Sequence, residues 1–114
     1  MINGYEVKII PSVYEDLQNI YDYIINAFEL SENANNTINA IENKIKELSN
    51  VPKRGMEYPY EPWRTRGLRM VFVNNYTIFY YVFDNDNVVK VVKVAYSKMD
   101  FNRLLKRFDE EQDN

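Results

Sequence analysis

The sequence contains neither cysteine nor histidine, and this limits which side chains could do chemistry. Without cysteine there are no thiol nucleophiles, no disulfides and no thiolate metal ligands. Without histidine there is no Ser-His-Asp triad, no imidazole acid–base pair and no imidazole ligand for zinc. No residues stand out at metal-ligand spacing, so we expect neither a metal nor another cofactor. Proton transfer must therefore use Lys, Tyr, Asp, Glu, water or the substrate itself.

The side chains that could hold an anion are concentrated in the middle of the chain. Residues 44–69 carry seven bases and three acids, whereas residues 1–43 carry one base and seven acids. The net charge of −3 argues against nonspecific coating of DNA but leaves room for a local basic site. The bases that cluster here or follow a helix end are Lys53, Arg54, Arg64, Arg66 and Arg69.

Aromatic residues are abundant, with ten Tyr, six Phe and one Trp among 114 residues. Such side chains favour sheets and cores. Tyr76 and Tyr80 are evenly spaced in a predicted strand and share a face, which favours core packing, although one hydroxyl could stay exposed. We expect Trp63 to be a plug over the sheet rather than a stacking platform.

A chain of this length makes one domain, whose first half is predicted to be a strand and two helices. Tyr5–Ile10 alternates like a strand. Ser12 and Glu15 have the spacing of a capping box for a helix that runs to Phe28. Ser31 can cap a second helix after a connection of about three residues, which predicts an antiparallel hairpin. The inner face of the second helix is predicted to contain Ala34, Ile38, Ile41, Ile45 and Leu48.

The second half is predicted to form strands after Pro52 ends the second helix. Residues 67–73, 76–83 and 88–96 are separated by short turns rich in Asn and Asp, which indicates a three-stranded antiparallel meander. Asp100 can cap a short C-terminal helix. The domain is therefore expected to cover residues 1–108 and to be α+β, with the helical hairpin over one face of the sheet. Residues 109–114 are expected to be a frayed acidic tail.

Nothing in the sequence predicts a membrane segment or a signal peptide. No apolar run approaches the roughly 18 residues that cross a bilayer, and the first ten residues lack a long apolar stretch. We therefore expect a cytoplasmic protein.

Four segments, in order and spacing, resemble the RelE/ParE family of toxins from type II toxin–antitoxin systems. Residues 14–24 are similar to the first helix of the family, and residues 45–55 to the end of its second helix. Residues 69–80 look like its arginine strand and tyrosine hairpin, and residues 94–100 like the segment after its last strand. The likeness extends over about residues 5–105.

The resemblance implies a small toxin that a cognate antitoxin neutralises. It would be a homodimer or part of a toxin–antitoxin hetero-oligomer. One branch of the family cleaves mRNA on the ribosome, and the other poisons DNA gyrase without cutting RNA. The exposed aromatic residues expected on the helices would suit an antitoxin helix, unless they all face the sheet. These residues are Tyr14, Tyr21, Tyr23 and Phe28.

The first branch, which we take as the first expectation, requires a metal-independent endoribonuclease site. A ribose 2′-OH attacks the neighbouring phosphate, so the site must deprotonate that hydroxyl, stabilise the phosphate and protonate the leaving oxygen. By resemblance, the catalytic candidates are Arg69 and Lys98 for the phosphate and Tyr96 or Tyr80 for a proton. The candidates for nucleic-acid binding are Lys53, Arg54, Arg64 and Arg66.

Two departures from the family pattern favour the alternatives. Thr77 stands where several RNA-cleaving relatives carry an arginine. Tyr96, Ser97, Lys98 and Met99 stand where many carry histidine or several arginines. A gyrase poison needs no acid–base pair, and a non-catalytic module that only binds an antitoxin needs none either.

Overall fold

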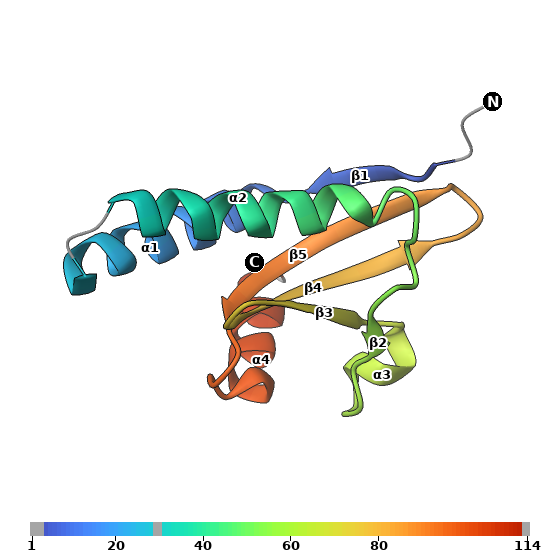
Figure 1. Ribbon diagram of the computed structural model, residues 1–114. Coiled ribbons are helices and arrows are strands. Elements are labelled where there is room, and N and C mark those ends of the chain that lie inside the picture. The colour runs from blue at the N-terminus through green and yellow to red at the C-terminus, as the bar shows by residue number, and fades with distance from the viewer. Residues whose placement is uncertain (1–3, 29–30, 113–114) are drawn as a thin grey trace.

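Within residues 4–28 and 31–112, which this computed structural model describes, the chain forms a five-stranded sheet with helices on both faces (Figure 1). The strands are β1 (Glu6–Ile9), β2 (Met56–Glu57), β3 (Arg69–Val73), β4 (Tyr76–Phe83) and β5 (Val88–Tyr96). The helices are α1 (Pro11–Phe28), α2 (Ser31–Glu47), α3 (Trp63–Arg66) and α4 (Phe101–Gln112). This is the predicted α+β architecture, with β2 and α3 added between α2 and β3. None of the described helices has the length and hydropathy needed to span a membrane.

The strands lie in the order β1-β5-β4-β3-β2, so the first strand joins the sheet beside the last. β3, β4 and β5 form the predicted antiparallel meander, and β1 runs parallel to β5. Asn74 and Asn87 adopt positive φ angles of 53° in the two connecting turns, as asparagine tolerates. A register shift between Phe79 and Tyr80 interrupts the pairing of β4 with β5.

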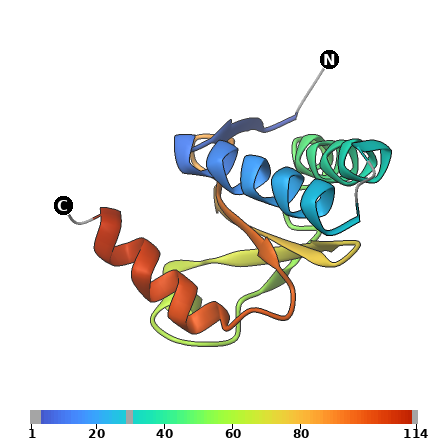
Figure 2. The same cartoon turned by 90° about the vertical axis from the view of Figure 1, so that its left-hand side faces the viewer.

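The helical hairpin of α1 and α2 covers one face of the sheet, as Figures 1 and 2 show. Ala34, Ile41, Ile45 and Leu48 of the predicted inner face are buried, and Ile38 is half-buried. Ile41, Ile45 and Leu48 pack in one cluster with valine, isoleucine and tyrosine side chains from β3, β4 and β5. The helical spacing of apolar residues therefore predicted this layer correctly.

α4 lies on the opposite face of the sheet (Figure 2). A second apolar cluster there includes Trp63 of α3 and Leu105 of α4. Trp63 is 6% exposed within it and is the predicted plug, with its ring against Tyr58. The Trp63 indole and the Arg66 guanidinium both donate to Asp109 of α4. These contacts join α4 to α3, and α4 extends through Gln112, into the segment predicted to be a frayed tail. Residues 113 and 114 lie outside the described residues.

The predicted helix caps give different results. The capping box at Ser12 is wrong, because α1 already begins at Pro11, and proline is well suited to the first turn. The Ser12 hydroxyl is buried without a hydrogen-bond partner in the described part of the chain. At α4, the Asp100 carboxylate accepts a hydrogen bond of 3.2 Å from the Arg103 amide, as predicted. The Ser31 side chain lies outside the described residues.

Asp16 of α1 joins the hairpin to the sheet where β1 ends. β1 pairs with β5 as far as Val91, and beyond it the Val94 amide donates to Asp16 Oδ2 at 3.1 Å. Lys93 Nζ donates to Asp16 Oδ1 at 2.9 Å. The Asp16 side chain is only 12% exposed. Burial raises its pKa above the ordinary value because it disfavours the charged form, while Lys93 and the Val94 amide oppose this rise.

We predict that replacement of Lys93 by methionine raises the pKa of Asp16 further, because the buried carboxylate then loses its counter-charge. The measurement is an NMR titration of the Asp16 carboxyl carbon. The wild type should titrate above the 3.8 of an ordinary aspartate, and Lys93→Met higher still. Lys90→Met removes the same charge from an exposed site on the same strand and should leave the midpoint nearly unchanged. Equal midpoints in the two variants would contradict the ion pair.

Candidate functional site

Arg69 lies at the start of β3 and holds the loop that follows α2. Its guanidinium donates to the main-chain carbonyls of Lys53 and Gly55, at 3.1 and 2.5 Å. Its Nε is buried without a hydrogen-bond partner among the described residues. A methyl group at Gly55 would come within 2.2 Å of the Met70 carbonyl oxygen, so the loop lies directly against β3. Arg69 is thus engaged by main-chain oxygens that would compete with a phosphate.

Tyr80 is the cross-strand partner of Arg69 and is completely buried. Its hydroxyl accepts a hydrogen bond of 3.0 Å from the Gly55 amide. Tyr80 therefore packs in the core beneath the same loop, as the even spacing with Tyr76 predicted.

Tyr96 and Lys98 lie at the other end of the sheet. Tyr96 pairs with Tyr76, and the two rings are 5.9 Å apart. Because Tyr76 and Tyr80 are separated by four positions of β4, the Tyr96 end lies roughly 13 Å along the strand from Arg69. Tyr96 is 41% exposed and Lys98 is exposed in the turn before α4. The four catalytic candidates thus form two separate pairs.

Three of the four basic residues predicted to bind nucleic acid are in ion pairs. Lys53 contacts Asp84 at 2.8 Å, Arg54 contacts Glu47 at 3.4 Å, and Arg66 contacts Asp109 at 2.8 Å. Arg64 is exposed on α3. Exposed ion pairs contribute little to stability, so these cations remain able to exchange their partners for a phosphate.

Asp84 connects the loop after α2 with the start of the chain. It accepts hydrogen bonds of 2.8 Å from Lys53 and from the Tyr5 hydroxyl. These two donors lower the pKa of Asp84 because they favour its charged form, and Asp84 in turn raises the pKa of Lys53. Asp84, one of the polar residues in the turn between β4 and β5, therefore anchors Lys53.

An open cleft of about 580 Å³ lies between α1 and the Tyr96 end of the sheet. Its wall on α1 includes Asp16 and Tyr23, and its opposite wall includes Tyr96 and Met99. Tyr23 is 65% exposed and Met99 is 50% exposed, so the rim is apolar and accessible. The Asp16–Lys93 ion pair is part of its lining. The sequence did not predict this pair because it joins two elements far apart in the chain.

Only some of the aromatic residues that we expected to be exposed on the helices are exposed. Tyr14 and Tyr23 are more than half exposed, whereas Tyr21 is half-buried. The Phe28 side chain lies outside the described residues.

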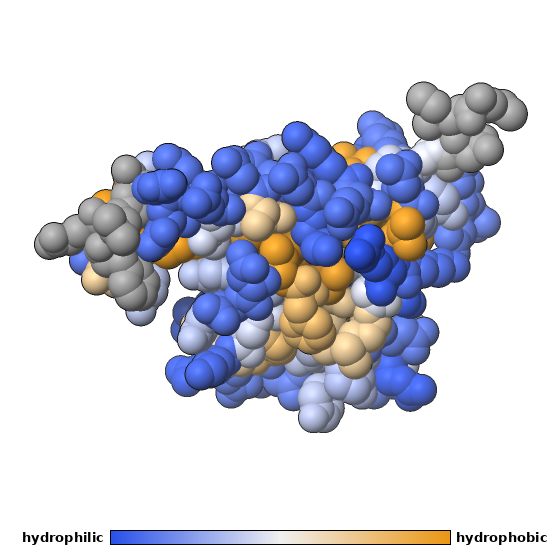
Figure 3. All heavy atoms as spheres, in the orientation of Figure 1, coloured by the Kyte–Doolittle hydropathy of each residue, from blue (hydrophilic) through white to orange (hydrophobic). Residues whose placement is uncertain are grey.

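A second apolar surface follows the open edge of β3 beneath α2 (Figure 3). Met56 and Phe72, from the strands there, are each 50% exposed. β2 pairs with only Arg69 and Met70, so in the described chain no further strand covers this edge beyond Met70.

Comparison with known proteins identifies a family for this chain and solved structures with a similar fold. Residues 7–101 match the family described as the ParE toxin of the type II toxin–antitoxin system parDE. No curated protein matches the sequence.

Solved structures share the fold at low sequence identity. A chain of the chromosomal ParDE toxin–antitoxin system from P. aeruginosa superposes with a TM-score of 0.68 and 19% identity, over 83% of this chain and 98% of that one. A chain of the toxin–antitoxin complex RelBE2 from Mycobacterium tuberculosis gives 0.58 and 20%, over 84% and 94%. A variant of the E. coli toxin RelE in the free state gives 0.59 and 14%, over 91% and 97%.

The family match spans most of the chain, and the superposed structures share its fold. This chain therefore belongs to the ParE toxin family of type II toxin–antitoxin systems.

Proposed function

We propose that this toxin arrests growth by binding its target without cutting RNA, and that the target is DNA gyrase. The observation that carries the proposal is the engagement of Arg69 and Tyr80 by the loop after α2. RNA cleavage needs a base, a cation and an acid around one phosphate. The residues predicted for these roles lie in two places separated by four positions of β4, and the Tyr80 hydroxyl belongs to a fully buried side chain. Membership of the ParE family supports gyrase as the target.

Cleavage of mRNA on the ribosome is the second candidate, and one observation favours it. Tyr96 and Lys98 are both accessible at the same corner, where a tyrosine could exchange a proton and a lysine could hold a phosphate. The ordinary pKa of tyrosine, near 10, makes it a weak base at neutral pH.

We further propose that the cleft between α1 and the end of β5 is where a cognate antitoxin docks. The exposed apolar side chains Tyr23, Tyr96 and Met99 would receive the apolar face of a helix. The RelBE2 structure from Mycobacterium tuberculosis, which has the same fold, is a complex of a toxin with its antitoxin. This supports a protein partner for the present chain as well.

The double variant Tyr96→Phe/Lys98→Ala separates the two mechanisms in bacteria. If the toxin acts by binding gyrase, growth arrest should persist, RNA 5′ ends should be unchanged, and plasmid DNA should be relaxed or broken. If it cleaves mRNA, the wild type should produce cuts inside translated codons, and the variant should lose both cuts and arrest. Cuts that depend on these two residues would refute the gyrase proposal. A harmless wild type would refute both and leave an antitoxin-binding module.

Replacement of Arg69 by alanine should destabilise the protein by about 1–3 kcal/mol, because two main-chain carbonyls lose their charged donor. The measurement is urea unfolding followed by circular dichroism. Arg64→Ala, at an exposed site, should change the free energy of unfolding by less than about 0.5 kcal/mol. If Arg69→Ala keeps wild-type stability but loses toxicity, Arg69 acts on the substrate and its structural role is refuted.

Tyr23→Ala and Met99→Ala should each weaken binding of the cognate antitoxin about tenfold or more, since they remove apolar anchors from the cleft. Isothermal titration with the purified antitoxin measures the effect. Tyr14→Ala removes an equally exposed tyrosine of α1 that does not line the cleft, and should leave the affinity unchanged. Equal losses in Tyr14→Ala and Tyr23→Ala would place the antitoxin elsewhere on α1.

A further inference from the structure

Beyond its apolar rim, the cleft between α1 and the end of β5 is bordered by two elements of opposite charge. α1 contains three acidic residues and no basic one, namely Glu15, Asp16 and Asp22. Residues 98–107, which lead from the cleft into α4, contain four bases and one acid. That acid is Asp100, whose carboxylate accepts a hydrogen bond from the Arg103 amide at the start of the helix. The cleft therefore lies between an acidic side, α1, and a basic side, residues 98–107.

The charged side chains on both sides of the cleft are accessible. Glu15 and Asp22 of α1 are exposed, and each is next in sequence to a residue that lines the cleft. Arg103 and Arg107 of α4 are exposed and one turn apart, with the cleft residue Leu104 between them in the sequence. Figure 2 shows α1 and α4 with the end of β5 between them.

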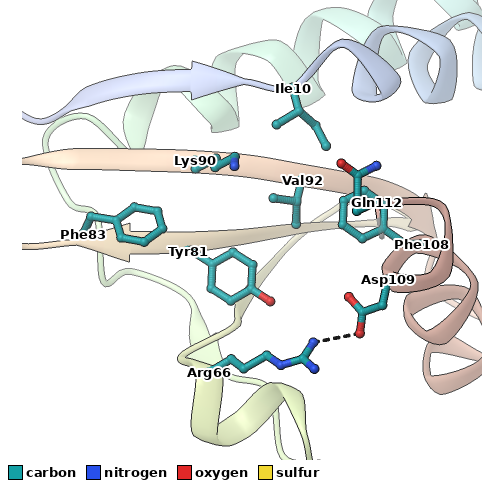
Figure 4. Close-up of a pocket in the computed structure, with 9 residues that line it drawn as sticks. All are labelled: Ile10, Arg66, Tyr81, Phe83, Lys90, Val92, Phe108, Asp109 and Gln112. Atoms are coloured by element: carbon teal, nitrogen blue, oxygen red, sulfur yellow. Dashed lines mark hydrogen bonds and ion pairs between the residues drawn. The ribbon is translucent and has the colours of Figure 1, made fainter. Parts of the chain in front are cut away.

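The two sides do not neutralise each other. In residues 4–28 and 31–112, no ion pair joins α1 to residues 98–107. The pocket of about 470 Å³ between β4, β5, α3 and α4 is different, because its Arg66 and Asp109 side chains pair with each other at 2.8 Å (Figure 4). An occupant of the cleft can therefore pair with charges on both sides without separating them from each other.

Between the two sides, much of the lining of the cleft is aromatic. Tyr76 of β4 and Tyr96 of β5 are cross-strand partners with ring centres 5.9 Å apart, and Tyr23 of α1 lines the same cleft. Burial and the nearby Tyr23 and Tyr96 raise the pKa of Tyr76, so its hydroxyl stays protonated at neutral pH. Such a lining accepts the apolar face of an amphipathic helix, whose two flanks then lie over the two charged sides.

We propose that the cleft selects an antitoxin helix with basic residues on the flank that faces α1 and acidic residues on the flank that faces α4. The inference rests on the proposed docking of the antitoxin in this cleft. A helix with such flanks fits in one direction only, because reversing it brings like charges together on both sides. Like-charge contacts also disfavour other partners, so the two charged sides set direction and specificity as well as affinity.

Three synthetic helical peptides with the same apolar face test this charge pattern. One has lysines on one flank and glutamates on the other, the second has lysines on both flanks, and the third has glutamates on both. Fluorescence anisotropy measures the binding of each labelled peptide to the full-length protein. The mixed peptide should bind about tenfold more tightly than the other two, because several exposed pairs that are weak individually act together. High salt should reduce this preference, since it screens exposed charges.

Charge reversal on one side of the cleft should switch the preference. Arg103→Glu/Arg107→Glu makes both sides acidic, so the peptide with lysines on both flanks should become the tightest ligand by about tenfold. The matched control is Lys46→Glu/Lys90→Glu, which changes the net charge equally at two exposed sites that do not line the cleft. This control should keep the wild-type preference. Circular dichroism melts verify that both variants are folded.

Met99→Ala locates the peptides, because Met99 is an exposed apolar residue of the cleft. Equal affinities of the three peptides, each weakened by Met99→Ala, would refute the charge pattern and leave the docking proposal standing. Affinities that Met99→Ala does not change would refute selection by the cleft. Whether the antitoxin docks there is decided separately, by its own titration against Tyr23→Ala and Met99→Ala.

Two other outcomes would overturn the proposal. A switch of equal size in the control variant would show only a general effect of net charge. If the protein alone sediments as a dimer that Met99→Ala dissociates, the occupant of the cleft is a second copy of this chain.

Discussion

β5 needs hydrogen-bond partners along both of its edges, and much of the structure follows from how they are supplied. β4 pairs with one edge, while β1 pairs with the first part of the other as far as Val91. Past that point, Asp16 accepts from the Val94 amide and binds the neighbouring Lys93. Because Asp16 lies in the second turn of α1, this carboxylate helps to position the helix over the sheet, together with the apolar packing of Val13 and Leu17. The cleft behind it depends on that position.

Most of the cations that drew attention in the sequence serve to connect elements of the fold. Arg69 holds the carbonyls of the loop after α2, and Lys53 binds Asp84 in the turn between β4 and β5. Arg66 binds Asp109 and so helps to attach α4. A small domain with a modest core gains specificity of packing from such contacts even where each contributes little free energy.

Local patterns predicted the elements well, and long-range contacts explain what they missed. The bounds of β4 and β5 and the buried face of α2 follow from alternation and helical spacing. The Ser12 cap failed because Pro11 could begin the helix one residue earlier. Asp16, Asp84 and Asp109 act on residues distant in the chain, so no spacing in the sequence marks them. For the same reason, the sequence did not reveal that the predicted catalytic residues form two pairs. Arg69 and Tyr80 lie four positions along β4 from the end where Tyr96 and Lys98 lie.

The uncovered edge of β3 bears on the behaviour of the toxin in solution. Between Val71 and Val73 the edge is bordered by the exposed ring of Phe72, and in the described chain it carries none of the lysines or prolines that keep sheet edges apart. Such an edge is a template on which the same strand of a second molecule can pair, and pairing of this kind grows steeply with concentration. A molecule built this way stays dispersed when it is scarce or when a companion chain covers the edge. Self-association through this edge therefore sets an upper limit on the concentration at which the protein stays dispersed.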